Sequence, residues 1–209
     1  MTPAKTILVL WSGGLDSTGL IEHCLADPQY DTVLAGYVLI GNNEAKTAAE
    51  LAAIARMWPL LAARNSKFAW LGTLMQVHFT RTNPNLAFKQ IPVWLITLVE
   101  AIHTPVDEVA IGYIRNSRPA EEDASSHLDD LRHLYNAYQP FMHKPLPRLV
   151  FPVAHLGKKE LFARLSPDLA EHCVTCAQPV ATDHGYQPCG HCPLCLRRAE
   201  ELQDLCQGL

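Results

Sequence analysis

Four cysteines near the C-terminus have the spacing of metal ligands. They are Cys176, Cys189, Cys192 and Cys195, so that twelve residues separate the first from two overlapping Cys-x2-Cys steps. Four thiolates suit a tetrahedral Zn²⁺ ion, and Gly190 permits the tight turn that a Cys-x2-Cys chelate needs. A closed site of four cysteines leaves no open position for catalysis. We therefore expect the metal to hold the C-terminal segment in place.

The cysteine pattern leaves three alternatives open. Cys173 could replace Cys176 as a ligand, the cysteines could hold an iron–sulfur cluster, or they could form redox-active disulfides. Seven cysteines is an odd number, and five of them fall within 23 residues, which favours metal binding over disulfides in a reducing compartment. The chain has no cysteine run of the ferredoxin type. Zn²⁺ is therefore the favoured metal.

A glycine-containing loop near the N-terminus has the residue types of an anion site. Between an apolar run and a helical pattern stand Ser12, Gly13, Gly14, Leu15, Asp16 and Ser17. Free backbone N–H groups and the helix dipole attract anions at the start of a helix, and adjacent glycines let a ligand approach the backbone closely. The serine hydroxyls can donate to phosphate oxygens, whereas the aspartate would repel phosphate unless a cation such as Mg²⁺ lies between them.

A nucleotide bound with Mg²⁺ would satisfy all of these groups together. The simpler alternative is that the two glycines form a tight turn and that Asp16 and Ser17 cap the helix. The preceding strand and the following helix favour the anion site. Trp11, directly before the loop, is a candidate for a contact with the nucleotide.

Strands alternate with helices along the chain. Short apolar runs predict strands buried on both faces, and apolar residues at helical spacing predict the helices between them. The predicted strands are residues 5–11, 32–40, 69–71, 108–114 and 148–153, and the predicted helices are 15–25, 44–63, 93–103, 124–137, 157–165 and 194–206. This order indicates an α/β fold with a doubly wound parallel sheet and a ligand site at the carboxyl edge of the strands.

The simplest division of the chain has two parts. Residues 1–170 would form a nucleotide-binding α/β domain, and residues 171–209 would form a small metal-binding segment with a final helix. We expect this segment to pack on the same domain.

Composition disfavours several classes of protein. Hydrophobic residues make up 48% of the 209 and charged residues 18%, as in a compact globule rather than a disordered chain or a coiled coil. A formal net charge of -4, with 17 scattered Lys and Arg, disfavours nucleic acid as the main partner. No apolar run approaches the roughly 18 residues of a membrane span, and no signal-peptide cleavage site follows the N-terminus. We expect no membrane partner and a cytoplasmic location.

The loop of residues 12–17 resembles the Ser-Gly-Gly-x-Asp-Ser signature of the PP-loop ATP pyrophosphatase family. With the cysteine pattern and the Leu-Arg-Arg at residues 196–198, the chain is similar to QueC, the 7-cyano-7-deazaguanine synthase family, over almost its whole length. The resemblance implies an adenine nucleotide α-hydrolase-like sheet that binds ATP with its β- and γ-phosphates in the loop. The carboxylate of 7-carboxy-7-deazaguanine would then attack the α-phosphate and release pyrophosphate.

The same resemblance implies roles for single residues and an assembly. Lys158, after the last strand, matches a lysine that family members carry there, and with Asp16 it would form the catalytic pair. The family resemblance also makes a homodimer the expected assembly.

Three family motifs are altered in this chain. Where QueC reads Tyr-Gly-Gln-Arg-His after the second strand, this chain has Ile-Gly-Asn-Asn-Glu at residues 40–44, and the motifs matching residues 92–95 and 115–123 differ as well. The phosphate and metal motifs survive, whereas those for the base and the acceptor do not. This combination predicts a divergent QueC-like ligase that passes the acyl group to ammonia, giving an amide or a nitrile, or to a protein amine in a conjugation or defence system.

Two other functions remain open. A tRNA-modifying PP-loop enzyme would also adenylate its substrate, but it would need a positively charged face, which a net charge of -4 disfavours. A zinc-stapled nucleotide-binding module without catalytic activity would bind ATP and release no pyrophosphate.

Overall fold

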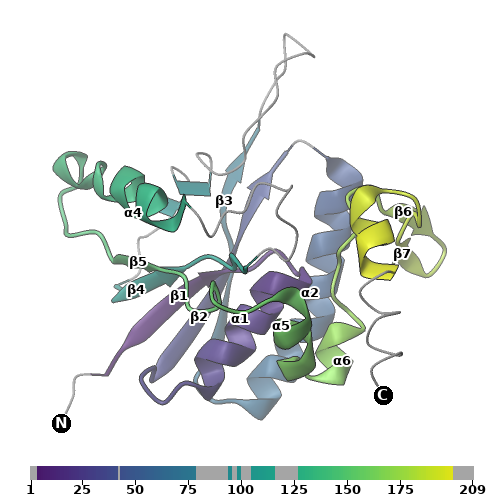
Figure 1. Cartoon of the computed structure of the whole chain (residues 1–209), viewed down its shortest axis with the longest axis horizontal. Helices are drawn as coiled ribbons and strands as arrows, with labels where there is room; N and C mark the ends of the chain where they lie inside the picture. The colour runs from purple at the N-terminus through teal and green to yellow at the C-terminus, as the bar shows by residue number, and fades with distance from the viewer. Residues whose placement is uncertain are drawn as a thin grey trace.

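A five-stranded sheet forms the centre of the fold (Figure 1). The computed structural model describes residues 4–41, 43–78, 94–95, 98–99, 105–115 and 127–199. The strands are β1 (Thr6–Leu10), β2 (Thr32–Ile40), β3 (Phe68–Val77), β4 (Glu108–Ala110) and β5 (Arg148–Val150). They lie in the order β3-β2-β1-β4-β5, and each pair of neighbours is parallel. The predicted α/β fold with a parallel sheet is confirmed.

Helices cover both faces of the sheet. The helices on one face are α1 (Leu15–Ala26), α2 (Glu44–Arg64), α5 (Lys158–Arg164) and α6 (Pro167–Ala170). On the opposite face, α4 (Leu128–Asn136) packs together with Leu98. Because side chains alternate along a strand, Ile7 and Val9 of β1 enter the first core and Leu8 enters the second. The sheet is therefore doubly wound, as predicted, and burial on both faces explains the unbroken apolar run of β1.

The strand boundaries differ from the predicted ones where burial and backbone pairing end at different residues. β4 ends at Ala110 and β5 ends at Val150, although the apolar runs continue to residues 114 and 153. Ile111 and Val153 remain buried beyond the paired strands, because an apolar run records burial rather than hydrogen bonding. β3 is longer than the predicted strand 69–71. Beyond Phe68 its side chains at this sheet edge are only partly buried or exposed, so no apolar run marks its length.

Most helices lie close to their predicted positions. α1 and α2 differ from the predictions by one residue at the C-terminal end and α5 by one residue at each end; α4 covers Leu128–Asn136, and residues 124–126 of its predicted range lie outside the described part of the chain. The final helix is described over residues 193–199, and residues 200–206 lie outside the described part of the chain. Of the helix predicted over 93–103, only residues 94–95 and 98–99 are described, and they are helical. Among the described helices, none has the length and apolar character to cross a membrane.

The chain reverses its direction across the sheet at the carboxyl end of β1. It passes through α1 to β2 on one side of β1 and, after β3, reaches β4 on the other side. Such a reversal leaves a crevice outside the carboxyl ends of the strands. Gly112, just after β4, approaches the loop that begins α1, since a Cβ there would lie 3.1 Å from backbone atoms of Asp16 and Ser17. The fold therefore places residues 12–17 in the crevice.

A buried carboxylate joins the strands at their amino ends, opposite the loop of residues 12–17. Glu108 is 2% exposed and accepts hydrogen bonds of 2.6 Å from the Tyr30 hydroxyl and 2.8 Å from Arg148 Nε, and it pairs with Lys5 Nζ at 2.8 Å. Burial acts to raise the pKa of Glu108, but the bonds from Lys5, Tyr30 and Arg148 outweigh it and hold the pKa below its ordinary value. The ionised carboxylate therefore stabilises the fold.

Replacing this carboxylate by an amide tests its contribution. Glu108→Gln should lower the free energy of unfolding at neutral pH by about 1–3 kcal/mol, because the amide cannot accept from all three partners. Since the pKa of Glu108 is lower in the folded chain, its contribution is present above the ordinary value of 4.5 and is lost as the pH falls through the folded value. Urea denaturation should therefore show a difference between the two proteins that shrinks in acid. An equal difference at neutral and acidic pH would contradict this account.

Candidate nucleotide site and metal centre

The loop between β1 and α1 is shaped by its glycines. Gly13 has φ +68°, in the region that favours glycine, and a Cβ there would lie 2.9 Å from the backbone oxygen of Glu50. Gly14 is the N-cap of α1 and offers no side chain to the N–H groups of the first turn. These N–H groups have no partners within the helix. The loop can therefore present backbone donors to an anion at the positive end of the helix dipole.

The two serine side chains brace this loop. Ser12 Oγ and Ser17 Oγ lie 3.1 Å apart, and Ser17 Oγ accepts from Ser12 N at 3.2 Å and donates to Gly14 O at 3.2 Å. The side chain of Leu15 packs in the core, so only the backbone of this predicted site residue can contact a ligand. Five of the six predicted loop residues line one cavity, namely Ser12, Gly14, Leu15, Asp16 and Ser17, and Gly13 makes the turn between them.

Trp11 does not have the suggested role in nucleotide contact. It is 1% exposed, and its Nε1 donates a hydrogen bond of 2.9 Å to Thr18 Oγ1 inside the core. Its ring meets those of Phe68 and Trp70 edge to face. Trp11 therefore packs in the core under the loop. Its position in the sequence, directly before the glycines, does not indicate whether its side chain is buried.

Asp16 has a carboxylate oxygen without a partner. Its Oδ1 is shielded from solvent and makes no hydrogen bond with any residue in the described part of the chain. Burial raises the pKa of Asp16, and the positive charges of Lys158 and Arg197 partly offset this effect. A buried carboxylate oxygen without a donor is costly unless a ligand completes it. A cation such as Mg²⁺ fits this oxygen, because Mg²⁺ takes oxygen ligands from carboxylates and phosphates together.

A cavity of about 210 Å³ opens beside the loop. Lys158, the first residue of α5, lines it together with the loop, so the predicted pair Asp16 and Lys158 meets in one site. Lys46 and Glu50 of α2 line it as well. The cavity thus combines backbone donors, two lysines and two carboxylates, a set that can hold a polyphosphate with its metal.

Several residues that line this cavity or act on it were not predicted from the sequence. Lys46 and Glu50 follow the second strand, so the rule that sites lie at carboxyl strand ends could have found them. Arg197, whose charge reaches Asp16, was noticed only as part of a family motif. Nothing in the sequence around residues 174–176 indicated that they form a wall of the cavity.

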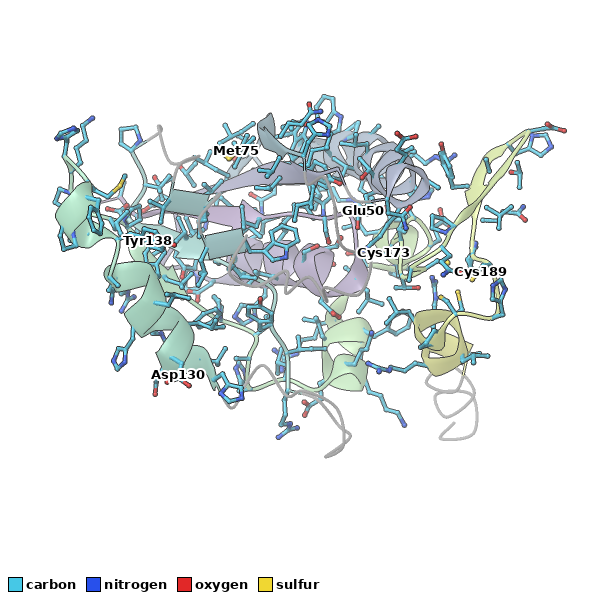
Figure 2. The ribbon with its side chains drawn as sticks, turned by 90° about the horizontal axis from the view of Figure 1, so that it is seen from above. Glu50, Met75, Asp130, Tyr138, Cys173 and Cys189 are labelled. Atoms are coloured by element: carbon cyan, nitrogen blue, oxygen red, sulfur yellow. The ribbon has the colours of Figure 1, made fainter. Side chains whose placement is uncertain are left out.

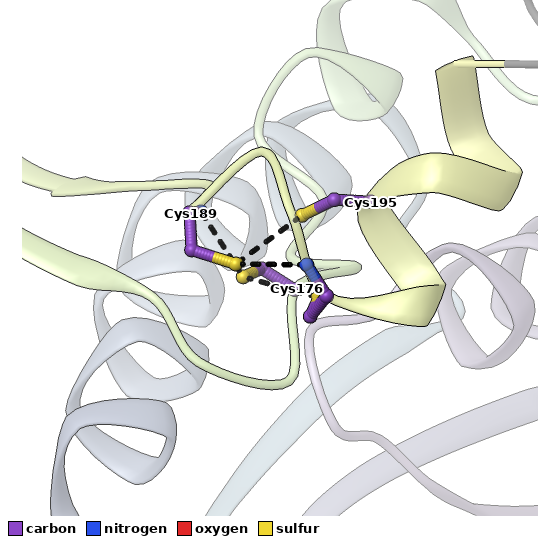
Figure 3. Close-up of side chains that lie close together, drawn as sticks. Cys176, Cys189 and Cys195 are labelled. Atoms are coloured by element: carbon purple, nitrogen blue, oxygen red, sulfur yellow. Dashed lines mark hydrogen bonds between the residues drawn. The ribbon is translucent and has the colours of Figure 1, made fainter.

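The four predicted metal ligands meet in one cluster (Figure 3). The sulfur atoms of Cys176, Cys189, Cys192 and Cys195 all lie within 4.8 Å of one another. Cys176 Sγ and Cys192 Sγ are 3.8 Å apart, and Cys189 Sγ and Cys195 Sγ are 4.0 Å apart. Backbone N–H groups of residues 178 and 189 donate to Cys176 Sγ, each at 3.3 Å. This donor set and its spacing fit a metal ion.

Cys173 is not part of the cluster. Its Sγ donates to Leu169 O at 3.3 Å, and burial raises the pKa of its thiol to about 11. The alternative that it replaces Cys176 as a ligand is therefore wrong. The long gap between the first two ligands holds a short antiparallel hairpin, β6 (Val180–Thr182) and β7 (Gly185–Gln187), which was not predicted.

The segment before the metal site is tied to the nucleotide loop. Val174 N donates to Gly13 O at 3.0 Å, and Asn43, which caps α2 by accepting from Lys46 N, also donates through Nδ2 to Ala177 O at 3.1 Å. Residues 174–176 separate the nucleotide cavity from a second cavity of about 410 Å³ between α2, β7 and the final helix. In Figure 2, the labelled Glu50, Cys173 and Cys189 lie at the same end of the molecule. The segment that carries the first cysteine of the cluster therefore forms a wall of the cavity beside the loop.

No protein-family model matches the chain, and no curated protein matches its sequence. Among solved structures, the U34-tRNA thiolase NcsA from Methanococcus maripaludis, with its 4Fe-4S cluster, is similar over 95% of this chain at 16% sequence identity, with a TM-score of 0.44. This chain spans 63% of the length of that protein chain.

Removing the metal should loosen the wall of the nucleotide cavity first. Metal binding can contribute on the order of 10 kcal/mol to the folding of a small site. Chelation, or the variant Cys192→Ser, should therefore lower the melting temperature and speed hydrogen exchange over residues 174–199 more than in β1 and β2. Exchange followed by mass spectrometry, with metal content measured in parallel, checks this.

Cys173→Ser is the matched control, because its sulfur lies outside the cluster. It should keep the metal and the slow exchange. Unchanged exchange and melting after complete metal removal would contradict a structural role for the centre.

Proposed function

We propose that this chain is an ATP-dependent, AMP-forming ligase of the QueC-like kind. The observation that carries the proposal is Asp16 in the phosphate loop, whose Oδ1 has no partner and which lines a cavity together with Lys46 and Lys158. A buried acid near the positive charges of Lys158 and Arg197, beside free helix N–H groups, suits a triphosphate bound with Mg²⁺. A turn with only a structural role would not need a buried carboxylate such as that of Asp16.

Each group in the cavity has a proposed task. The backbone of residues 13–17 and the hydroxyls of Ser12 and Ser17 bind the β- and γ-phosphates. Asp16 would hold Mg²⁺, which would neutralise the charge of the pyrophosphate leaving group. Lys158 adds a positive charge beside the same phosphates. Catalysis of this type depends on positioning and charge neutralisation, so these groups suffice without a protein nucleophile.

The proposed reaction has two steps. A carboxylate oxygen of the substrate attacks the α-phosphorus, the bond to the bridging oxygen breaks, and pyrophosphate leaves with the electron pair. An amine then attacks the acyl carbon of the adenylate, and AMP leaves. The QueC resemblance makes 7-carboxy-7-deazaguanine the proposed carboxylate, and ammonia or a protein amine the proposed acceptor.

We propose Zn²⁺ as the metal of the cysteine cluster. With Zn–S bonds of about 2.3 Å, the sulfurs of a tetrahedral site lie about 3.8 Å apart. The separations of 3.8 Å and 4.0 Å support a single ion of this size. An iron–sulfur cluster would place several iron and sulfide atoms between the thiolates and spread them farther. The zinc then has a structural task, since it keeps residues 174–176 against the loop.

The second candidate is a nucleotide-binding module that does not turn over. The altered motifs for the base and the acceptor favour it, because a chain that lost its substrates could keep the phosphate loop and the metal centre. It would bind Mg-ATP through the same residues and release no pyrophosphate. Product analysis therefore separates the two candidates.

The variant Asp16→Asn tests the catalytic proposal. Incubated with Mg-ATP, 7-carboxy-7-deazaguanine and ammonium, the unaltered protein should form AMP and pyrophosphate, and the variant should do so about 10²–10³-fold more slowly. The unliganded variant should be no less stable than the unaltered protein, because the replaced oxygen lacks a partner. Mass spectrometry of products and thermal unfolding measure the two effects.

Asp130→Asn is the matched control, since Asp130 is 79% exposed on α4, outside the cavity. It should leave turnover unchanged. ATP binding by the unaltered protein without any AMP would reject the ligase in favour of the binding module.

A further inference from the structure

Inside the cavity, the carboxylate of Glu50 faces the side-chain ammonium group of Lys46. Its Oε1 lies 3.7 Å from Lys46 Nζ, and its Oε2 accepts a hydrogen bond of 2.7 Å from the Tyr37 hydroxyl. The side chain is 15% exposed and lines the same cavity as Ser12 and Asp16. One carboxylate oxygen is therefore held by the sheet, and the other is turned toward a cation.

The fold fixes this arrangement from two sides. Tyr37 is 2% exposed on β2, so its hydroxyl is a rigid donor that orients the carboxylate. Lys46 and Glu50 are four residues apart and share one face of α2. Asn43 caps this helix and thereby fixes the residue at which α2 begins. Glu50 Oε1 is thus the carboxylate oxygen that Tyr37 does not hold, and the ammonium group of Lys46 lies beside it in this structure.

We propose that Glu50 Oε1 binds the amine acceptor and takes its proton. The inference rests on the proposed function, because an amine is needed only after an acyl adenylate has formed. An ammonium ion and a protonated protein amine both carry a positively charged nitrogen, like the Lys46 Nζ that lies beside Glu50 in this structure. Lys46 has a long flexible side chain, and phosphate oxygens in the cavity draw it away from Glu50. The Oε1 atom is then available to the acceptor.

The step balances as follows. The ammonium acceptor gives one proton to Glu50 Oε1 and becomes a neutral amine. Its nitrogen lone pair attacks the acyl carbon, the bond from that carbon to the phosphate oxygen breaks, and AMP leaves with the electron pair. The nitrogen loses a further proton to solvent, and Glu50 returns its proton to solvent before the next cycle.

The surroundings of Glu50 suit this role. Burial raises the pKa of Glu50, and Lys46 and Tyr37 partly offset the effect. A general base works best when its pKa lies near the working pH, so the shift is in the useful direction. The other charged or titratable groups that line the cavity are Asp16, Lys46, Lys158 and Cys176.

Glu50→Gln separates the amine step from adenylation. The amide still accepts from Tyr37 but cannot take a proton, so amide formation with ammonium should fall about 10²–10⁴-fold. Exchange of labelled pyrophosphate into ATP, measured with the carboxylate substrate, should stay within about twofold of the unaltered protein. Hydroxylamine, which is largely neutral at neutral pH, should restore product formation as the hydroxamate.

Two further variants sharpen the test. Tyr37→Phe leaves the carboxylate but frees its orientation, so it should raise KM for ammonium more than it lowers kcat. Glu44→Gln is the matched control, because Glu44 is an exposed glutamate in the first turn of the same helix. It should match the unaltered protein in both half-reactions. In Glu50→Gln alone, the rate of amide formation should rise with pH in proportion to the fraction of free ammonia.

The outcomes are distinct. An equal loss of pyrophosphate exchange and amide formation in Glu50→Gln would assign Glu50 to the nucleotide and overturn the proposal. Unchanged amide formation, or a loss that hydroxylamine does not relieve, would overturn it as well. If the unaltered protein shows no pyrophosphate exchange, the proposed function itself fails, and the amine site fails with it.

Discussion

An acidic side chain buried without a full set of donors is a cost to folding, and Asp16 carries that cost at the centre of this structure. The strand β1 is buried on both faces, so the chain that leaves it must turn within the crevice between its two neighbours. Gly13 makes the turn and Gly112 lets the next strand approach it. The sheet therefore holds Asp16 where its Oδ1 finds no donor among the described residues. The positive charges of Lys158 and Arg197 partly offset the effect of this burial, and the unpartnered oxygen suits a cation bound together with a polyphosphate.

The C-terminal segment completes the site from outside the sheet. The cysteine cluster fixes residues 174–176, and Val174 passes that constraint to the loop through its bond to Gly13 O. The final helix, which contains the last cysteine ligand, also contains Arg197, whose charge reaches Asp16. The cysteine cluster therefore helps to shape the cavity and brings the charge of Arg197 near Asp16.

Local patterns in the sequence were sufficient for the parts of the structure that depend on neighbours in the chain. The loop, its flanking strand and helix, and the four clustered cysteines could all be predicted, because each depends on short spacing and on residue type. The ends of β4 and β5 could not be predicted, since apolar runs record burial and not pairing. Lys46 and Glu50 were missed because their role depends on α2 and the loop meeting in space. Trp11 was misjudged for the same reason, as burial beneath the loop is a property of the whole fold.

The central claim is that a carboxylate attacks the α-phosphate of ATP in this cavity. A substrate carboxylate labelled with oxygen-18 tests it directly, because the oxygen that bridges the acyl group and the phosphate leaves with AMP when the amine attacks. Mass spectrometry of the AMP should find one labelled oxygen in each molecule formed with ammonium present. AMP that carries no label, or ADP as the nucleotide product, would contradict the account.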